Sequence, residues 1–143
     1  MLYEFLYNGI GQRTSLSVGT SGNMETLASY TYNSRNLTSR LTYGNGVYAD
    51  YTYDDLDRLI KTRYNNNESD KTEYTYDNSG RVTRAANSSS GYTSLYSYDM
   101  AGRVREFLRT GTTSAGTQRF RVNYLTDRVA RGKYRFGFCN FTA

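Results

Sequence analysis

The residues Tyr74-Thr75-Tyr76-Asp77-Asn78-Ser79-Gly80-Arg81-Val82 return almost unchanged at Tyr96-Ser97-Tyr98-Asp99-Met100-Ala101-Gly102-Arg103-Val104. Looser copies begin at Tyr51, Tyr30 and Phe5, and a weaker sixth copy, at Phe120, lacks the turn residues. The second aromatic residues of the five copies are Tyr7, Tyr32, Tyr53, Tyr76 and Tyr98, so successive copies are 25, 21, 23 and 22 residues apart. A period of this length is typical of an array built from one supersecondary unit.

Each copy predicts a β-hairpin. The two tyrosines are two residues apart, so on a strand both point to the same face, and the threonine or serine between them points to the other. The residues Asp77-Asn78-Ser79-Gly80 are typical of a type I turn followed by a left-handed residue that forms a G1 bulge. Aspartate in the first position can accept hydrogen bonds from backbone N–H groups, and glycine in the fourth adopts positive φ without strain.

This pattern assigns two sets of structural residues. The predicted turn residues are Asp54, Asp57, Asp77, Gly80, Asp99 and Gly102, where Asp57 replaces the glycine of the clearer copies. The predicted core of the repeat consists of the paired tyrosines Tyr30, Tyr32, Tyr51, Tyr53, Tyr74, Tyr76, Tyr96 and Tyr98.

A lone hairpin is marginal in water, so the units must pack against one another. Each aromatic side chain that becomes buried contributes about 1.5–3 kcal/mol. We therefore predict an all-β fold in which tandem hairpins stack into an open, curved antiparallel sheet. Residues 1–129 form the array of five to six repeats, and residues 130–143 are an unassigned basic and aromatic tail. No segment has the apolar spacing and caps of a helix.

The amino-acid composition excludes several kinds of functional site. The 143 residues include 16 tyrosines, 6 phenylalanines and one cysteine, Cys139, but no histidine, tryptophan or proline, and the mean hydropathy is −0.76. Without histidine the chain has no imidazole base or ligand, and one cysteine forms no intramolecular disulfide. We expect no catalytic residue, no cofactor and no metal site, and therefore no enzyme. Asp54, Asp55 and Asp57 could form an acid/base pair or a calcium site, but their turn positions favour a structural role.

The net charge of +5 is unevenly distributed. Residues 101–143 carry +7 and residues 1–100 carry −2. Such a block can bind phosphates, but charge runs are more often solvated strand edges, so we do not expect a nucleic-acid partner. We expect neither a membrane span nor a signal peptide from this sequence, and it assigns the chain to no compartment.

The repeated phrase resembles the YD repeats of the Rhs family, which also occur in bacterial wall-associated proteins and in the teneurins. The resemblance runs from Phe5 to Val104 and more weakly to Val129. It implies a hollow shell of hairpins wound as a spiralling β-sheet around a C-terminal domain, often a toxin, in proteins that are secreted or attached to the cell surface. A closed shell needs more repeats than this chain has, so the resemblance implies a fragment. Because the chain lacks proline, the family's Asp-Pro-rich plug and its cleavage site have no counterpart here.

Three functions follow in order of preference. The first is a structural repeat segment of an Rhs-type β-shell or wall-associated region, whose partners are further YD repeats or a second copy joined through exposed strand edges. The second is a carbohydrate-binding surface module in which exposed tyrosines stack on sugars. The third is a glycosidase or nuclease, which the missing histidine disfavours most.

Overall fold

In the computed structural model, residues 1–111 and 117–121 are described. They belong to two compact units, one within residues 1–72 and one that begins at Glu73. The strands of the first unit are β1 (Leu2–Tyr7), β2 (Arg13–Thr20), β3 (Asn23–Tyr32), β4 (Thr38–Tyr43), β5 (Tyr48–Tyr53) and β6 (Leu59–Tyr64). The second unit contains β7 (Lys71–Tyr76), whose first two residues precede the boundary, β8 (Val82–Asn87), β9 (Tyr92–Tyr98), β10 (Val104–Gly111) and β11 (Thr117–Arg121).

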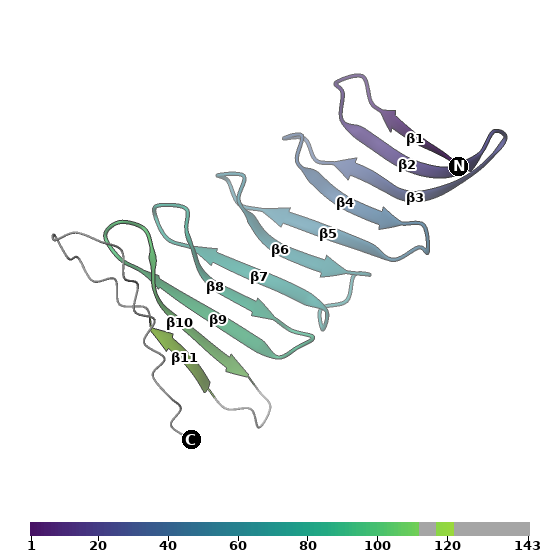
Figure 1. Cartoon of the computed structure of the whole chain (residues 1–143). Helices are drawn as coiled ribbons and strands as arrows, with labels where there is room; N and C mark the ends of the chain where they lie inside the picture. Colours follow the sequence, from purple (N-terminus) through teal and green to yellow (C-terminus); the bar gives the residue numbers. More distant parts are fainter. Residues whose placement is uncertain (112–116, 122–143) are drawn as a thin grey trace, which may run out of the picture. The chain divides into compact units, whose positions relative to one another are not determined.

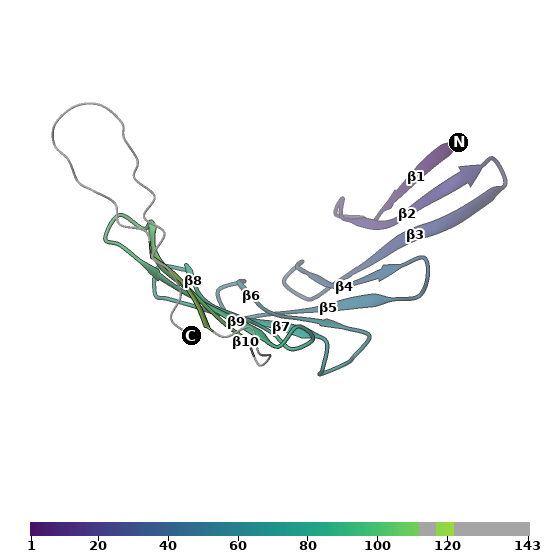
Figure 2. The same ribbon diagram turned by 60° about the horizontal axis from the view of Figure 1, so that its bottom comes forward.

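Within each unit the strand order is the chain order, so every strand runs beside its sequence neighbours (Figure 1). The registered pairs are all antiparallel, including β1 with β2, β5 with β6 and β9 with β10. The strands of a unit form a single layer that Figure 2 shows from a second direction. The structure confirms the predicted all-β fold of tandem antiparallel hairpins in an open sheet. The tail predicted at residues 130–143 lies outside the described residues.

In four of the hairpins, the register of the two strands shifts directly after the turn. Tyr53 pairs with Leu59, but Thr52 pairs with Lys61, so the return strand carries one extra residue. The same shift follows the pairs Tyr32–Thr38 and Tyr98–Val104. An extra residue of this kind is a β-bulge, which increases the local twist of the strand. Because of the bulge, Leu59 and Thr62, three residues apart, lie opposite two tyrosines that are only two residues apart.

The two faces of the sheet differ as the alternation predicts. All eight paired tyrosines are half-buried, whereas the residues between them, Thr31, Thr52, Thr75 and Ser97, are exposed. On the exposed face, hydroxyls of paired strands meet at 3.1 Å, in Thr31 with Ser39, which is the extra residue of its bulge, and in Thr75 with Thr83. We call the side that carries the paired tyrosines the tyrosine face.

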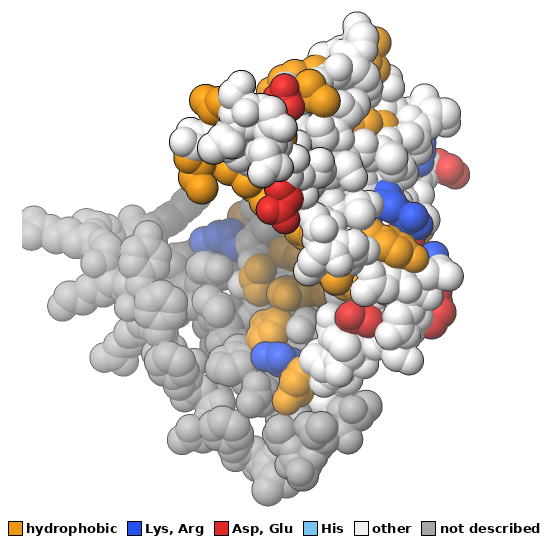
Figure 3. Space-filling view, turned by 90° about the vertical axis from the view of Figure 1, so that its right-hand side faces the viewer, with side chains coloured by type: hydrophobic (Ala, Val, Ile, Leu, Met, Phe, Trp, Pro, Cys, Tyr) orange, Lys and Arg blue, Asp and Glu red, His pale blue; other side chains and the backbone are white. Residues whose placement is uncertain are grey.

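Small side chains, not tyrosines, occupy the fully buried positions of the described chain. Ala49 has no exposed surface, Ala28 is 8% exposed, and Ser17 and Thr62 are also buried. No large side chain among the described residues is completely buried, and hydrophobic side chains are visible at the surface among polar ones (Figure 3). This follows from the single layer, because a ring on an uncovered sheet can be enclosed only by its lateral neighbours.

No helix in the described part of the chain has the length and apolar character that a membrane span requires.

Candidate functional site

The five hairpin turns that follow the paired aromatics share one backbone pattern. In the fourth copy, Asp77 N–H donates to the carbonyl of Arg81 at 2.9 Å, and Gly80 N–H donates to the carbonyl of Asp77 at 3.0 Å. The same two bonds close the turns that begin at Asn8, Asn33, Asp54 and Asp99. The fourth turn residue has positive φ in every copy, at Gly11, Asn36, Asp57, Gly80 and Gly102, with values from 61° to 81°. Glycine, asparagine and aspartate are the residues that tolerate this region best.

The first residue of each turn holds the backbone with its side chain. Asp77 Oδ1 accepts hydrogen bonds from the N–H groups of Ser79 and Arg81, both at 2.9 Å. Asn8, Asn33, Asp54 and Asp99 accept the equivalent pair of bonds at 2.9–3.1 Å. An asparagine or aspartate oxygen in this position replaces the solvent that the turn N–H groups would otherwise need.

Three turns add an ion pair. The second carboxylate oxygen of Asp77 lies 2.7 Å from Arg81 Nε, and Asp54 with Arg58 and Asp99 with Arg103 repeat this arrangement. The backbone N–H of Arg81 and its guanidinium hold the pKa of Asp77 below its usual value, despite the opposing effect of burial. The backbone N–H of Arg103 does the same for the pKa of Asp99. Burial raises the pKa of Asp54, but hydrogen bonds from Arg58 outweigh it and the net shift is downward.

In three of the phrases, the second tyrosine joins its repeat to the preceding one. Tyr53 Oη donates to the carbonyl of Thr38, in the preceding hairpin, at 2.9 Å. Tyr32 donates in the same way to Arg13 and Tyr98 to Val82, both at 2.6 Å. Each acceptor stands five residues after the first turn residue of its own hairpin. We call these bonds the tyrosine ladder.

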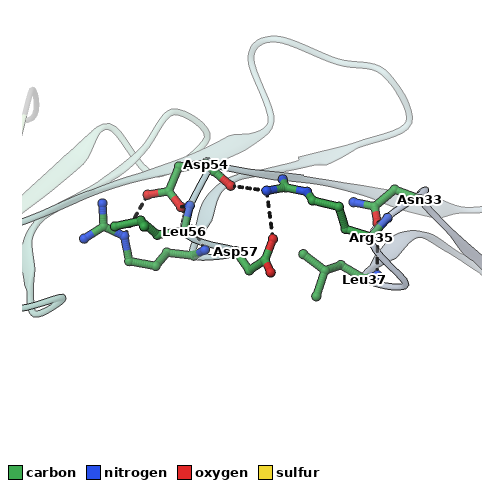
Figure 4. Close-up of polar contacts among 7 residues, drawn as sticks. Asn33, Arg35, Leu37, Asp54, Leu56 and Asp57 are labelled. Carbon is green, nitrogen blue, oxygen red and sulfur yellow. Dashed lines mark hydrogen bonds and ion pairs between the residues drawn. The ribbon is translucent and has the colours of Figure 1, made fainter.

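Other side chains reach in the opposite direction, from one turn to the next (Figure 4). Arg35 Nη1 donates to the carbonyl of Asp54 at 2.8 Å and lies 2.8 Å from the carboxylate of Asp57. One repeat earlier, Gln12 Nε2 donates to the carbonyl of Asn36 at 2.9 Å. In the second unit, the guanidinium of Arg81 stacks on the ring of Tyr98 at 4.6 Å, within the range of a cation–π contact.

Two phenols on the tyrosine face, those of Tyr51 and Tyr53, have pKa values shifted by burial. Burial raises the pKa of the Tyr51 phenol, and the nearby hydroxyls of Tyr43 and Tyr64 add to the shift. Burial also raises the pKa of Tyr53. Across the sheet, Tyr96 and Phe107 are paired, with ring centres 5.2 Å apart. The rings therefore contact one another sideways along the layer.

On the opposite face, charged side chains form a chain that connects the four strands β4 to β7. Asp50 accepts two bonds from Arg40, at 2.6 and 3.1 Å, and Arg63 lies 3.8 Å from the same carboxylate. Arg63 also pairs with Glu68 at 2.7 Å, and Glu68 pairs with Lys71 at 3.0 Å. These two cations lower the pKa of Glu68 to about 2.

The structure does not bring the predicted carboxylates together as a reactive group. Asp54 and Asp57 are directed to Arg58 and Arg35, respectively, and Asp55 is exposed. Within residues 1–111 and 117–121 no cluster of three metal-ligating side chains occurs. The turn residues are instead placed where adjoining repeats meet.

Comparison with known proteins gives a likeness of fold. No protein-family model matches the chain, and no curated protein matches it. The crystal structure of TcdB2-TccC3-TEV matches with a TM-score of 0.55 and 16% identity, over 84% of this chain and 8% of that chain. A structure of the Photorhabdus luminescens Tc holotoxin pore matches with a TM-score of 0.54 and 16% identity, over 83% of this chain and 8% of that chain.

A third structure, TcdB2-TccC3 without its hypervariable C-terminal region, matches with a TM-score of 0.56 and 16% identity, over 87% of this chain and 9% of that chain. The chain thus spans less than a tenth of the Tc toxin chains whose fold it shares.

Proposed function

We propose that this chain is a structural repeat segment of a larger YD-repeat protein of the Rhs type, in which it forms part of an encapsulating β-shell and performs no catalysis of its own. The observation that carries the proposal is how the polar turn groups are used. The Asp54, Asp77 and Asp99 carboxylates bind their own turns, and the tyrosine ladder and Arg35 bind the neighbouring repeat.

The likeness to the Tc toxin structures supports the same proposal. Nearly the whole chain superimposes on a small part of a much longer one. A segment that contacts only its neighbours can be repeated many times, since repeat proteins gain stability from nearest-neighbour interfaces. The encapsulated molecule would then be a separate part of the parent protein.

The test is made on the parent protein. We expect its coding region to contain further in-frame Tyr-x-Tyr-Asp phrases beside this segment. Electron microscopy of the purified full-length protein should show a hollow β-shell, and the enclosed polypeptide should resist protease until the shell is unfolded. A coding region with no further repeats, or a parent protein without an enclosed space, would refute the proposal.

A second candidate function is carbohydrate binding on the tyrosine face. It is favoured by Tyr43 and Tyr64, which end strands β4 and β6 and are 42% and 37% exposed. Aromatic rings with one open face can stack on sugars while their hydroxyls remain in water. A glycan-array screen should then yield a saturable ligand whose binding is lost in Tyr43→Ala, and the absence of any saturable ligand eliminates this candidate.

A further inference from the structure

We propose that Asn45, in the turn between β4 and β5, is a self-modification site. There the chain converts the side-chain amide of Asn45 into a carboxylate through a cyclic imide with Gly46, and water is the co-reactant.

Two asparagines of the chain stand directly before a glycine. They are Asn8, in the first repeated turn, and Asn45. Glycine has no Cβ, so no side chain of the following residue obstructs the approach of its backbone nitrogen to the asparagine side chain. We therefore expect the two sites to be equally reactive in an unfolded chain, and the folded structure decides between them.

In the fold, the side chain of Asn8 holds its own turn. Its Oδ1 accepts hydrogen bonds from the N–H groups of Ile10 and Gln12 at 3.1 and 2.9 Å, and its Nδ2 donates to Gln12 Oε1 at 2.8 Å. Asn8 is also half-buried. The three hydrogen bonds must break before the side-chain carbonyl carbon can turn towards the nitrogen of Gly9.

Asn45 has no such role, because it is the third residue of a turn that begins at Tyr43. It is exposed, and its Oδ1 accepts a hydrogen bond from the N–H of Val47 at 3.1 Å. The Gly46 N–H donates to the carbonyl of Tyr43 at 2.9 Å. Two hydrogen bonds, including the one made by the attacking nitrogen, therefore restrain the reaction at Asn45, against three at Asn8.

The same turn is fixed at its start and unobstructed at its end. The Gly44 N–H donates to the carbonyl of Leu27 on β3 at 2.8 Å, and a Cβ at Gly44 would collide with the carbonyl of Thr26. Gly46 has φ of 83°, and a Cβ added there would meet no heavy atom within 4 Å. Opening of the turn is therefore least hindered at the peptide unit that must rotate for the reaction.

The reaction needs no group beyond the chain, water and hydroxide. The Gly46 nitrogen gives its proton to hydroxide and attacks Cγ of Asn45, which closes the imide ring. The bond from Cγ to Nδ2 breaks, and ammonia leaves with a proton taken from water. Water then adds to one of the two imide carbonyls and reopens the ring, which leaves either aspartate or isoaspartate at position 45.

The two products affect the turn differently. Aspartate keeps the backbone and adds a negative charge to the exposed turn. Isoaspartate lengthens the backbone by a methylene group, which separates the Gly46 N–H from the carbonyl of Tyr43 and should loosen the connection between β4 and β5.

The experiment incubates the full chain, either folded or unfolded in urea, at mildly alkaline pH with hydroxylamine, which cleaves a chain at the imide. Mass spectrometry identifies fragments 1–45 and 46–143 from Asn45, and fragments 1–8 and 9–143 from Asn8. We expect equal cleavage at the two sites in the unfolded chain. In the folded chain, cleavage at Asn8 should be about two- to tenfold slower than at Asn45, which is the effect of one additional hydrogen bond of about 0.5–1.5 kcal/mol on a rate.

Two variants and an internal control test the cause. Asn45→Gln prevents closure of the same ring and should abolish cleavage at that position. Gln12→Ala removes the partner of Asn8 Nδ2, so cleavage at Asn8 should rise towards the rate at Asn45. Asn78 is also exposed in a turn but precedes Ser79, whose side chain hinders the attack, so it should react more slowly than Asn45.

Equal rates at Asn8 and Asn45 in the folded chain would overturn the inference. So would a folded chain that stays intact under conditions that cleave the unfolded chain at both sites. An unchanged rate at Asn8 in Gln12→Ala would overturn it as well, since hydrogen bonds would then not decide between the two sites. Each of these outcomes is independent of whether the parent protein forms a shell.

Discussion

Replacement of Gly80 by valine isolates the strain of the repeated turn. Gly80 has φ of 78°, and a Cβ added there would meet no heavy atom within 4 Å, so the substitution causes no collision. The loss must then come from the backbone, because a β-branched residue in the left-handed region costs about 1–3 kcal/mol. Valine also restricts the unfolded chain more than glycine does, and this loss of unfolded-state entropy stabilises the folded chain by about 0.4–1 kcal/mol, which offsets part of the cost. We expect Gly80→Val to lower the free energy of unfolding by about 1.3 kcal/mol, the difference between the middle values of these two terms.

Two variants of the same turn serve as controls. Gly80→Asn should be milder, since Asn36 adopts φ of 64° at the equivalent position. Ser79→Ala should change stability by about 0.5 kcal/mol at most, because Ser79 is exposed. Urea unfolding measures the three variants, and hydrogen exchange of the 77–81 amides locates the effect. If valine and asparagine are equally tolerated, or if Ser79→Ala is as harmful as valine, the turn is not strained in the way proposed.

Three further predictions concern single contacts. Tyr98→Phe keeps the ring under Arg81 but removes the bond to Val82, so unfolding in urea should show a loss of about 0.5–1.5 kcal/mol. Ala49→Leu should destabilise the chain by about 1–3 kcal/mol in thermal unfolding, because Ala49 has no exposed surface; no loss would mean that the site is not closely packed. The pKa of Glu68 is lowered from 4.5 to about 2 in the folded chain, so its contribution is complete above 4.5 and disappears as pH falls towards 2. Glu68→Gln should therefore be less stable than the parent chain at neutral pH and equal to it below about 2 in an acid titration, and a constant difference at all pH values would contradict this.

The hairpins were predictable because their signals are local. An aspartate, a glycine three residues later and two tyrosines in alternation are enough to specify a turn and one face of a strand. The structure places Asp77 and Gly80 at the two ends of one four-residue turn, with the hydrogen bonds and the positive φ described above. The stacking of the hairpins was predicted because a lone hairpin cannot bury its tyrosine face, and the open sheet followed from the resemblance to the YD repeats.

The contacts between repeats were not predicted, because they depend on how strands from different hairpins are aligned. A β-bulge after the turn contributes to this alignment in four hairpins, and no residue type marks it: the extra residue is Ser39 in one hairpin and Ile60 in another. One signal was present in the sequence. The second aromatic of all five copies is tyrosine, whereas the first is phenylalanine at Phe5. A position that never accepts phenylalanine indicates that the hydroxyl, and not only the ring, is used.

The arrangement of small and large residues explains how an uncovered sheet of this kind can be stable. Burial of large side chains is incomplete, so the hydrophobic contribution per residue is smaller than in a two-layer domain. The sideways contacts compensate, since each of the two repeat boundaries within the first unit adds a hydroxyl-to-carbonyl bond and a polar contact between turns. In repeat proteins each interface between neighbours adds its own stabilisation. A strand with a neighbour on both sides should therefore be more stable than a strand with a neighbour on one side only.

A gradient of local stability within the first unit follows from this argument. Strand β1 has one described neighbour, while β4 and β5 each have two, and Ala49 on β5 is completely buried. Local opening should therefore need less free energy at β1 than at β5. Native-state hydrogen exchange of the full chain should show the β1 amides that donate to β2 exchanging faster than the amides of β5. Equal protection of the two strands would mean that the first unit opens only as a whole, and that its boundaries do not contribute separately.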